Sequence, residues 1–226
     1  MLWGLLLLLH TGSLADTADY NSATGIEISV EAASSKAKQY EKVSQAIVEV
    51  RRKDTYSYGT GTLFERKKDI FVLTAAHVVG EHDEAVVQYK SIEILGKVVY
   101  YDEASDIAVI SVSPIENRTP LKAKFRKKTL AMGESTLYCG FPNKKELACF
   151  SGTISLVSNS LINIHSYAWM GASGSSVIDK KGKIIGVLSA VEVGVVWGLP
   201  QLIEDVVWVK QLDSNFFDSL ETGFSK

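Results

Sequence analysis

The chain has 226 residues, of which 46% are hydrophobic and 22% are charged, and its formal net charge at neutral pH is −2. This composition is typical of a globular protein and excludes a disordered or fibrous chain. The small net charge provides no overall attraction for nucleic acids, and the local basic clusters lack interleaved aromatic residues that could stack on bases. We therefore expect no nucleic-acid partner.

The first fifteen residues differ in kind from the rest. Leu2 to Leu9 form an almost unbroken apolar run, followed by Ser13-Leu14-Ala15 with small residues at the two positions that a signal peptidase inspects. This pattern predicts a signal peptide over residues 1–15 and a secreted or periplasmic protein. Because no Lys or Arg precedes the run, an uncleaved N-terminal membrane anchor is the alternative. No later segment has the roughly 20 apolar residues of a membrane helix, so no stable membrane insertion is expected after cleavage.

Residues 16–42 are polar and rich in Ala, Ser and Lys, which predicts a lead-in that is either mobile or folded into a short helix. Beyond them, short β-rich segments alternate with turn residues, without long helical periods. The expected strands are 46–50, 56–64, 70–74, 85–89, 92–101 and 107–112 and, after a basic loop with two prolines at 113–128, 135–140, 147–157, 160–164, 175–179, 184–190 and 193–197. Such a series predicts antiparallel sheets that close into barrels or a sandwich.

Residues 200–220 carry apolar side chains at a spacing closer to helical than to alternating. We expect a C-terminal helix that packs on the second half of the chain. The two cysteines, Cys139 and Cys149, flank a turn-like sequence between two apolar runs, so they can face each other across a hairpin. An oxidising compartment would make this pair a disulfide, and two buried unreactive thiols are the alternative. No cysteine or histidine spacing indicates a metal site, and no cofactor is expected.

A bend at residues 170–177 packs small residues and two glycines around Ser173. Glycine tolerates backbone angles that expose a serine hydroxyl and neighbouring N–H groups, which is what a nucleophile with an oxyanion hole requires. A Gly/Ser cluster is more often a simple turn. Two further segments favour the nucleophile, because His77 ends an apolar strand and Asp106 begins another. Their order along the chain, His then Asp then Ser, is a known order for a catalytic triad.

The segments TAAHVV around His77, DIAV after Asp106 and GASGSSV around Ser173 resemble the three catalytic motifs of trypsin-like (chymotrypsin-fold) serine endopeptidases. Their spacing is most similar to the bacterial HtrA-type and glutamyl-endopeptidase-type branches. The resemblance runs from about residue 43 to 207 and implies an all-β fold of two antiparallel six-stranded barrels with a C-terminal helix. We accordingly expect barrels at 43–125 and 126–226 with the cleft between them. No PDZ-like module is expected after residue 207.

The resemblance also implies the roles of the site residues. Ser173 would attack the peptide carbonyl, His77 would act as general base and then acid, and Asp106 would orient the imidazole. The backbone N–H groups of Gly171 and Ser173 would form the oxyanion hole. Ser189 resembles a family serine whose hydroxyl supports the catalytic aspartate. The substrate is then a polypeptide.

Two positions depart from the digestive members of this family. Ala172 stands where those members carry an aspartate that pairs with a newly cut N-terminus, so we expect no activation of that kind. The predicted substrate pocket has Glu192 as its one acidic side chain, which favours a preference for apolar residues at P1, the residue that precedes the cleaved bond. The residues expected to line this pocket are Tyr167, Ala168, Met170, Ala190, Val191 and Glu192.

Two other functions remain compatible with the sequence. The fold could serve as a secreted pseudoprotease that binds partners without cleaving them. It could also serve as an esterase-like or host-interaction protein with incidental proteolysis.

Overall fold

The computed structural model describes residues 35–54, 57–122, 124–127, 129–144 and 146–224, and the predicted signal peptide lies outside them. Residues 35–44, which overlap the end of the lead-in predicted at 16–42, are helical. Residues 39–226 form one compact unit. No helix in the described part of the chain is long and apolar enough to span a membrane.

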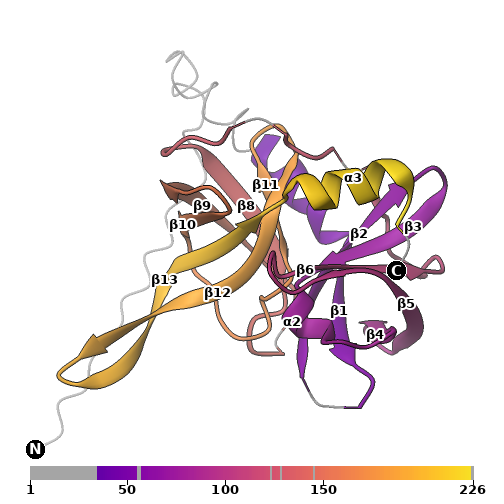
Figure 1. Ribbon diagram of the computed structural model, residues 1–226, viewed down its shortest axis with the longest axis horizontal. Helices are drawn as coiled ribbons and strands as arrows, with labels where there is room; N and C mark the ends of the chain where they lie inside the picture. Colours follow the sequence, from indigo (N-terminus) through magenta and orange to yellow (C-terminus); the bar gives the residue numbers. More distant parts are fainter. Residues whose placement is uncertain (1–34, 55–56, 123, 128, 145, 225–226) are drawn as a thin grey trace, which may run out of the picture. The chain divides into compact units, whose positions relative to one another are not determined.

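The first barrel contains the six strands expected in the first half of the chain. They are β1 (Ile47–Arg52), β2 (Tyr58–Arg66), β3 (Asp69–Thr74), β4 (Glu84–Tyr89), β5 (Ile92–Asp102) and β6 (Ile107–Val112). Their order is β1-β4-β5-β6-β3-β2, and pairing of β1 with β2 closes the antiparallel barrel (Figure 1). A two-residue strand, β7 (Leu121–Lys122), adds to β2 in parallel within the segment expected to be a loop.

The second barrel is also closed and has six strands. They are β8 (Ser135–Gly140), β9 (Ala148–Val157), β10 (Leu161–His165), β11 (Ser176–Asp179), β12 (Ile184–Val196) and β13 (Leu199–Gln211), in the order β10-β13-β12-β11-β8-β9. A single 3₁₀ turn, η1 (Pro142–Lys144), lies between β8 and β9. The expectation of two six-stranded antiparallel barrels is therefore confirmed.

Each barrel surrounds its own apolar core. Phe64, Leu73 and Ile110 belong to the first core, and Tyr138 and Leu188 belong to the second. Gly61 shows how tightly the first barrel closes, because a Cβ at this position would lie 2.3 Å from the Val72 side chain and 2.7 Å from that of Val50. The absence of a side chain at Gly61 lets the opposing valines fill the interior.

The expectation of a helix beginning near Pro200 is wrong for most of that segment. Residues 199–211 form strand β13, which pairs with β10 and β12, and the predicted strand at 193–197 is the end of β12. Val207 and Val209 are fully buried in the second core, while Trp208 between them is half-buried. Residues 199–211 form a strand because one of their faces is buried in the core and two neighbouring strands offer backbone hydrogen bonds. These tertiary interactions outweigh the helical spacing of the local sequence.

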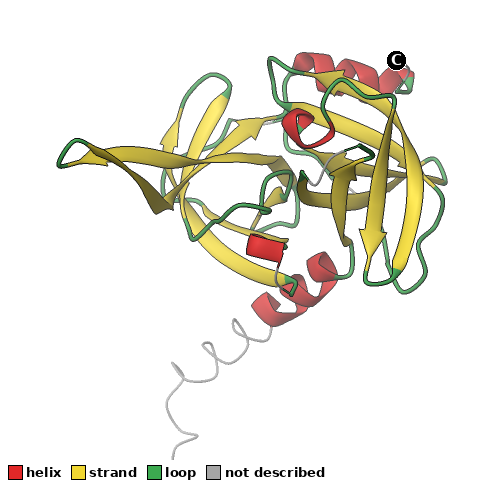
Figure 2. Ribbon diagram, turned by 90° about the horizontal axis from the view of Figure 1, so that it is seen from below, coloured by secondary structure: helices red, strands yellow, loops and turns green. Residues whose placement is uncertain are grey.

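The C-terminal helix is confirmed as α3 (Ser214–Thr222), but it packs on the first barrel rather than the second. The Asp213 carboxylate caps it by accepting a hydrogen bond from the Phe216 N–H at 2.9 Å. The buried Phe216 ring lies 6.0 Å from that of Tyr100 in β5 and 5.3 Å from that of Phe125. Figure 2 shows this helix beside the C-terminus, over the strands of that barrel. The aromatic residues at this end of the barrel supply the apolar cover that Phe216 requires.

Candidate active site

His77 lies in the one-turn helix α2 (Ala76–Val79), directly after β3. Ala76, Val78 and Val79 are buried in the first core, and their burial anchors the turn. The His77 side chain stays 48% exposed. The Arg52 guanidinium donates to the His77 carbonyl oxygen at 2.7 Å, which fixes the backbone of this turn from the side of β1. The imidazole is therefore presented to solvent on a rigid support.

Asp106 precedes β6 and adopts a positive φ of 52°, a conformation that aspartate tolerates better than most residues. Its side chain is 12% exposed. The His77 ring nitrogen Nδ1 lies 3.0 and 2.9 Å from the two carboxylate oxygens, and the His77 backbone N–H donates to the same carboxylate at 2.9 Å. The Asp106 carboxylate thus joins the start of β6 to helix α2 through three contacts with His77.

Ser189 in β12 reaches the same carboxylate from the second barrel. Its hydroxyl donates to Asp106 Oδ2 at 2.5 Å. Burial raises the pKa of Asp106, but hydrogen bonds from the His77 ring, the Ser189 hydroxyl and the His77 backbone outweigh this effect, so its pKa lies below the usual range. The carboxylate is therefore held in its charged form.

The bend around Ser173 is held by contacts of its backbone to both barrels. The Thr60 N–H donates to the Ser173 carbonyl at 2.7 Å, and the Gly174 N–H donates to the Leu188 carbonyl at 2.8 Å. Gly174 adopts a φ of 91°, and a Cβ there would lie 2.1 Å from the Thr60 carbonyl oxygen. The glycine is thus required for the close approach of this bend to β2.

The Ser173 hydroxyl donates to the Ser189 carbonyl oxygen at 3.3 Å. Ser189 therefore contacts Ser173 through its carbonyl and Asp106 through its hydroxyl, which brings the predicted triad members together around one residue of β12. Within the described residues, no hydrogen bond joins Ser173 directly to His77.

The two backbone N–H groups predicted for the oxyanion hole, those of Gly171 and Ser173, donate to no acceptor within the described chain. The carbonyl groups near them are engaged elsewhere. The Gly171 carbonyl accepts from the Thr60 hydroxyl at 2.7 Å, and the Met170 carbonyl accepts from the Asn143 N–H at 2.6 Å. Gly171 has a φ of 95°, which favours glycine. This arrangement leaves two amides available for an anionic ligand.

Residues 59–187, more than half of the chain, match the family model of the "Trypsin-like peptidase domain". The chain belongs to this family.

Two curated relatives of the trypsin-like domain are the "Serine protease HtrA-like" proteins of Staphylococcus aureus strains bovine RF122 / ET3-1 and USA300. They are 27% and 26% identical over alignments 155 positions long, and the matches cover 58% of this chain and 20% of each relative. The chain thus spans about a fifth of the length of the curated relatives it matches.

Solved structures show the same fold. The active form of the Rv3671c protease from M. tuberculosis superimposes with a TM-score of 0.65 at 18% identity, over 86% of this chain and 88% of that one. The serine endoprotease from Yersinia pestis gives a TM-score of 0.63 at 18% identity, over 82% and 65%. The HtrA-type protease AlgW with a tripeptide gives 0.66 at 18% identity, over 82% and 62%.

The six residues predicted for the substrate pocket of this trypsin-like domain lie in different environments. Ala168 is buried in the second core, and Val191 packs half-buried against it. Met170 and Tyr167 are 65% and 45% exposed, and Ala190 is also exposed. Glu192 is half-buried, and its carboxylate accepts a hydrogen bond from the Trp208 indole N–H.

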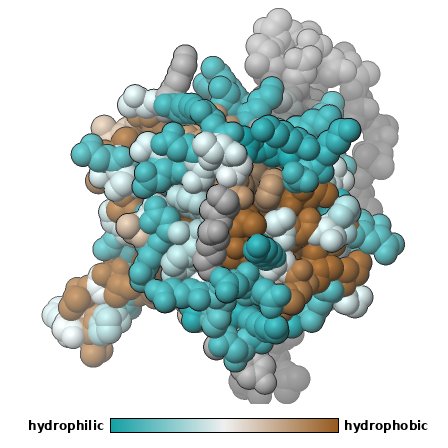
Figure 3. Space-filling view, turned by 45° about the vertical axis from the view of Figure 1, so that its right-hand side comes forward, coloured by the Kyte–Doolittle hydropathy of each residue, from teal (hydrophilic) through white to brown (hydrophobic). Residues whose placement is uncertain are grey.

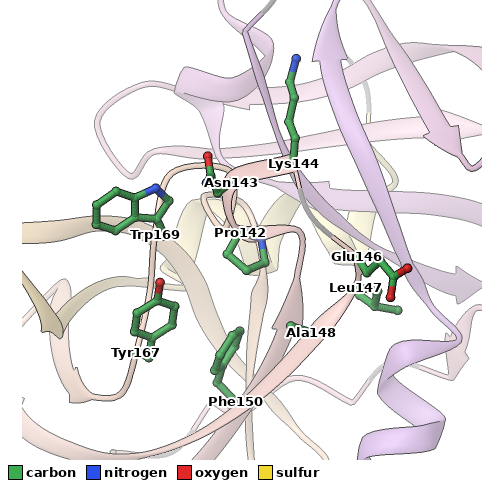
Figure 4. Close-up of a pocket in the computed structure, with 9 residues that line it drawn as sticks. All are labelled: Pro142, Asn143, Lys144, Glu146, Leu147, Ala148, Phe150, Tyr167 and Trp169. Atoms are coloured by element: carbon green, nitrogen blue, oxygen red, sulfur yellow. The ribbon is translucent and has the colours of Figure 1, made fainter. Parts of the chain in front are cut away.

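A cavity of about 940 Å³ lies beside the Ser173 bend of the trypsin-like domain (Figure 4). The Tyr167 and Phe150 rings stand next to each other on one wall, with centroids 5.4 Å apart, and Trp169 lies above them. The lining residues are Pro142, Asn143, Lys144, Glu146, Leu147, Ala148, Phe150, Tyr167 and Trp169. Of the predicted pocket residues, Tyr167 lines this cavity. Sequence reasoning missed Trp169, although an aromatic residue so close to the bend was a usable signal.

The disulfide predicted between Cys139 and Cys149 is present, and the two residues are direct cross-strand partners in β8 and β9. It ties the hairpin whose loop supplies most of the cavity lining. Asn143 in that loop bonds the Met170 carbonyl, so the tied hairpin supports the residue immediately before Gly171. The bridge therefore braces one side of the candidate oxyanion hole.

Proposed function

We propose that this chain is a serine endopeptidase that cleaves peptide bonds through an acyl-enzyme formed on Ser173. The observation that carries the proposal is the linkage at Ser189, which joins the His77–Asp106 pair of the first barrel to the Ser173 bend of the second. The backbone amides of Gly171 and Ser173, which have no acceptor among the described residues, supply the second requirement for acyl transfer.

In this proposal, His77 is the general base. Its Nδ1–H donates to the Asp106 carboxylate, so the other ring nitrogen, Nε2, carries the lone pair that can accept a proton. The Ser173 hydroxyl leaves the Ser189 carbonyl and turns toward Nε2 when substrate binds, since catalytic hydrogen bonds commonly tighten only in the complex. The ionised Asp106 carboxylate then stabilises the imidazolium.

The chemical steps follow from these positions. The Ser173 oxygen forms a bond to the scissile carbonyl carbon while its proton passes to His77. The Gly171 and Ser173 amides stabilise the resulting oxyanion, and loss of one such donor commonly lowers the rate about 10²- to 10³-fold. His77 next protonates the leaving amine as the carbon–nitrogen bond breaks. A water molecule, deprotonated by His77, hydrolyses the acyl-enzyme and restores the Ser173 hydroxyl.

We further propose a preference for apolar residues at P1. The one acidic residue of the predicted pocket, Glu192, is engaged by the Trp208 indole, which competes with its use as a partner for a basic substrate side chain. Cleavage-site profiling on a peptide library tests this preference. Enrichment of Lys or Arg at P1 would contradict it.

Activation is proposed to need no newly cut N-terminus. The Ala172 side chain is fully buried in the second core and carries no charge that a terminal ammonium could pair with. A purified form beginning near residue 16 is expected to cleave casein without prior processing. Strict dependence on a cut near residue 43 would show that this expectation is wrong.

The residue ranges 43–125 and 126–226 are proposed as the two barrel domains, and the disulfide supports an extracytoplasmic location. A binding role without catalysis is the second candidate function. The observation that favours it is the Ser173 hydroxyl bonded to a main-chain carbonyl rather than to His77.

A fluorophosphonate probe separates these two functions. We expect labelling of the parent chain, loss of labelling in Ser173→Ala, and strong reduction in His77→Ala, together with cleavage of library peptides. Labelling that survives in Ser173→Ala would exclude this nucleophile. Absence of both labelling and cleavage would favour the binding role.

A further inference from the structure

Strand β2 approaches the Ser173 bend so closely that little room remains for side chains. A Cβ at Gly59 would lie 2.7 Å from the Ser173 carbonyl oxygen. The next residue, Thr60, is fully buried and still carries a hydroxyl group. A buried hydroxyl costs free energy unless it forms hydrogen bonds, so its partners indicate what it does in this position.

The Thr60 hydroxyl bonds two separate segments of the second barrel. It donates to the Gly171 carbonyl oxygen at 2.7 Å, and it accepts a hydrogen bond from the N–H of Phe141, the residue that follows β8, at 3.1 Å. The Thr60 backbone is fixed in turn. Its carbonyl accepts from the Thr74 hydroxyl at 2.8 Å, and its N–H donates to the Ser173 carbonyl at 2.7 Å. One side chain of the first barrel thus joins the end of β8 to the bend.

Gly171 is the residue at which this contact bears on the proposed reaction. With a φ of 95° and no side chain, Gly171 has more backbone freedom than other residues would have. The Asn143 N–H holds the Met170 carbonyl at 2.6 Å, and because the peptide bond is trans, the Gly171 N–H points the opposite way. The Thr60 hydroxyl holds the Gly171 carbonyl, which belongs to the other peptide group of the same residue. The two bonds together restrain the backbone on both sides of Gly171.

Thr62, two residues further along β2, separates this contact from ordinary packing between the barrels. Thr62 is also fully buried, and its hydroxyl oxygen accepts a hydrogen bond from the Ser176 N–H at 3.2 Å. This bond joins the two barrels as well, but it reaches the first residue of β11 rather than Gly171. Residues two apart on a strand share a face. The same residue type therefore makes the same kind of contact with and without a connection to the candidate oxyanion hole.

We propose that Thr60 is a positioning residue for the oxyanion hole. By holding the Gly171 carbonyl, its hydroxyl keeps the Gly171 N–H directed at the oxygen of the scissile carbonyl as negative charge develops there. Thr60 acts through Gly171 and not by contact with the substrate. This inference rests on the proposed endopeptidase function and adds a requirement to it, since a side chain of the first barrel sets one of the two donors that the second barrel supplies.

Three variants of the full chain test the inference. Thr60→Val keeps the branched shape of the side chain but removes the hydroxyl. We expect kcat per folded molecule to fall about 10²-fold, as for a misplaced catalytic group, with KM changed by less than about threefold. Thr60→Ser keeps the hydroxyl and should restore most of kcat.

Thr62→Val is the matched control, because it removes the hydroxyl of the neighbouring contact between the barrels. It should retain the kcat of the parent chain even where it loses stability. Thermal unfolding gives the folded fraction of each variant. Equal losses of kcat in the two valine variants would overturn the inference, since they would reflect weakened barrel packing alone.

A tetrahedral adduct reports on the oxyanion hole directly. The probe is a peptidyl trifluoromethyl ketone with an isotope-labelled carbonyl carbon. The Ser173 oxygen bonds to this carbon, the serine proton passes to His77, and the ketone oxygen becomes an oxyanion. We expect the pKa of the adduct hydroxyl, followed by carbon NMR, to be higher in Thr60→Val than in the parent, because the anion loses a well-placed donor. The same pKa in the parent, Thr60→Val and Thr62→Val would contradict the proposed positioning.

Amide NMR spectra test the geometry without any reaction. In the full-length, nitrogen-labelled Ser173→Ala chain, adding Thr60→Val should shift the Gly171 amide resonance, and adding Thr62→Val should leave it in place. Apolar side chains gather on the projecting hairpin of β12 and β13 (Figure 3), so spectra at two concentrations serve to detect self-association.

The two kinds of measurement separate the inference from the proposed function. If the Gly171 resonance shifts as expected but the parent neither cleaves peptides nor forms the adduct, the proposed function fails while the positioning of Gly171 by Thr60 stands. If the parent cleaves peptides and Thr60→Val cleaves them equally well, the positioning role fails while the proposed function stands.

Discussion

The histidine and serine halves of the candidate site are held in different ways. The His77 and Asp106 side chains are joined directly, with nitrogen–oxygen distances of 2.9 and 3.0 Å. The Ser173 hydroxyl instead donates to the carbonyl of Ser189 at 3.3 Å. The charged half is thus already assembled in this structure, whereas in the proposed reaction the Ser173 hydroxyl must leave the Ser189 carbonyl for His77.

The difference follows from electrostatics. Reorienting a partly buried carboxylate during the reaction would cost considerable free energy, so catalytic sites fix such groups in advance. A hydroxyl moves between two acceptors at small cost, because one hydrogen bond replaces another. The five predictions below separate the two halves, from the largest expected effect to the smallest.

Ser173→Ala removes the nucleophile and leaves the His77–Asp106 pair in place. We expect kcat/KM for peptide cleavage to fall about 10⁶-fold, as for removal of a serine nucleophile in related chemistry. The free energy of unfolding should change by less than about 0.5 kcal/mol. Peptide cleavage assays and thermal unfolding measure the two quantities. A large loss of stability would mean that the hydroxyl supports the bend structurally.

Asp106→Asn breaks the charged half. We expect kcat to fall about 10⁴-fold, because an amide presents the wrong group to His77 Nδ1 and no longer stabilises the imidazolium. Asp179→Asn is the matched control, since Asp179 is 3% exposed and is hydrogen-bonded to Arg126 away from the site. The control should lose stability without losing turnover per folded molecule. Equal losses of turnover would argue against a role of Asp106 in the reaction.

Gly171→Ala tests the oxyanion hole. A Cβ at this position would lie 2.5 Å from the Phe141 carbonyl oxygen, and the φ of 95° is strained for alanine. We expect kcat to fall about 10²- to 10³-fold as the amide is displaced. Gly133→Ala provides the control, because Gly133 has a similar φ of 85° with no heavy atom within 4 Å of the added Cβ. Turnover per folded molecule should be unaffected in the control.

Ser189→Ala removes the hydroxyl bonded to Asp106 but keeps the carbonyl bonded to Ser173. We expect kcat to fall about tenfold, because a hydrogen bond to a charged group is lost while His77 still holds the carboxylate. The pH dependence of kcat is the informative measurement, since a positioning role should shift its acid limb. Ser155→Ala, which removes a hydroxyl bonded to Asn163 instead, should leave the profile unchanged.

The contribution of the Asp106 carboxylate to the free energy of unfolding should depend on pH in the acid range. The pKa of Asp106 in the folded chain lies below its unfolded value of about 3.9, so the fold favours the ionised form. The resulting stabilisation is fully present above that unfolded value and is lost as the pH falls through the folded pKa. The difference in unfolding free energy between the parent and Asp106→Asn should therefore shrink below about pH 4. A difference that grows on acidification would contradict the lowered pKa.

Most strands were predictable because their signals are local. In the first half, alternating apolar residues bounded by turn residues marked all six barrel strands. The disulfide could also be predicted, since the two cysteines flank a turn at symmetric positions. The prediction of a helix from residue 200 was wrong because β13 is stabilised by pairing with β10 and β12. The local spacing of apolar residues carries no information about these partners.

The sequence by itself determined which residues are candidates for the nucleophile, the base and the carboxylate of the proposed reaction, and where glycine permits a tight bend. Tertiary structure alone decided how these groups meet. Ser189 links Asp106 to Ser173 because β12 runs past both the Asp106 carboxylate and the Ser173 bend. Helix α3 covers the first barrel because the Phe216 ring packs against aromatic rings there, such as that of Tyr100. Such features depend on partners distant along the chain, and burial and pairing with those partners outweigh local preference.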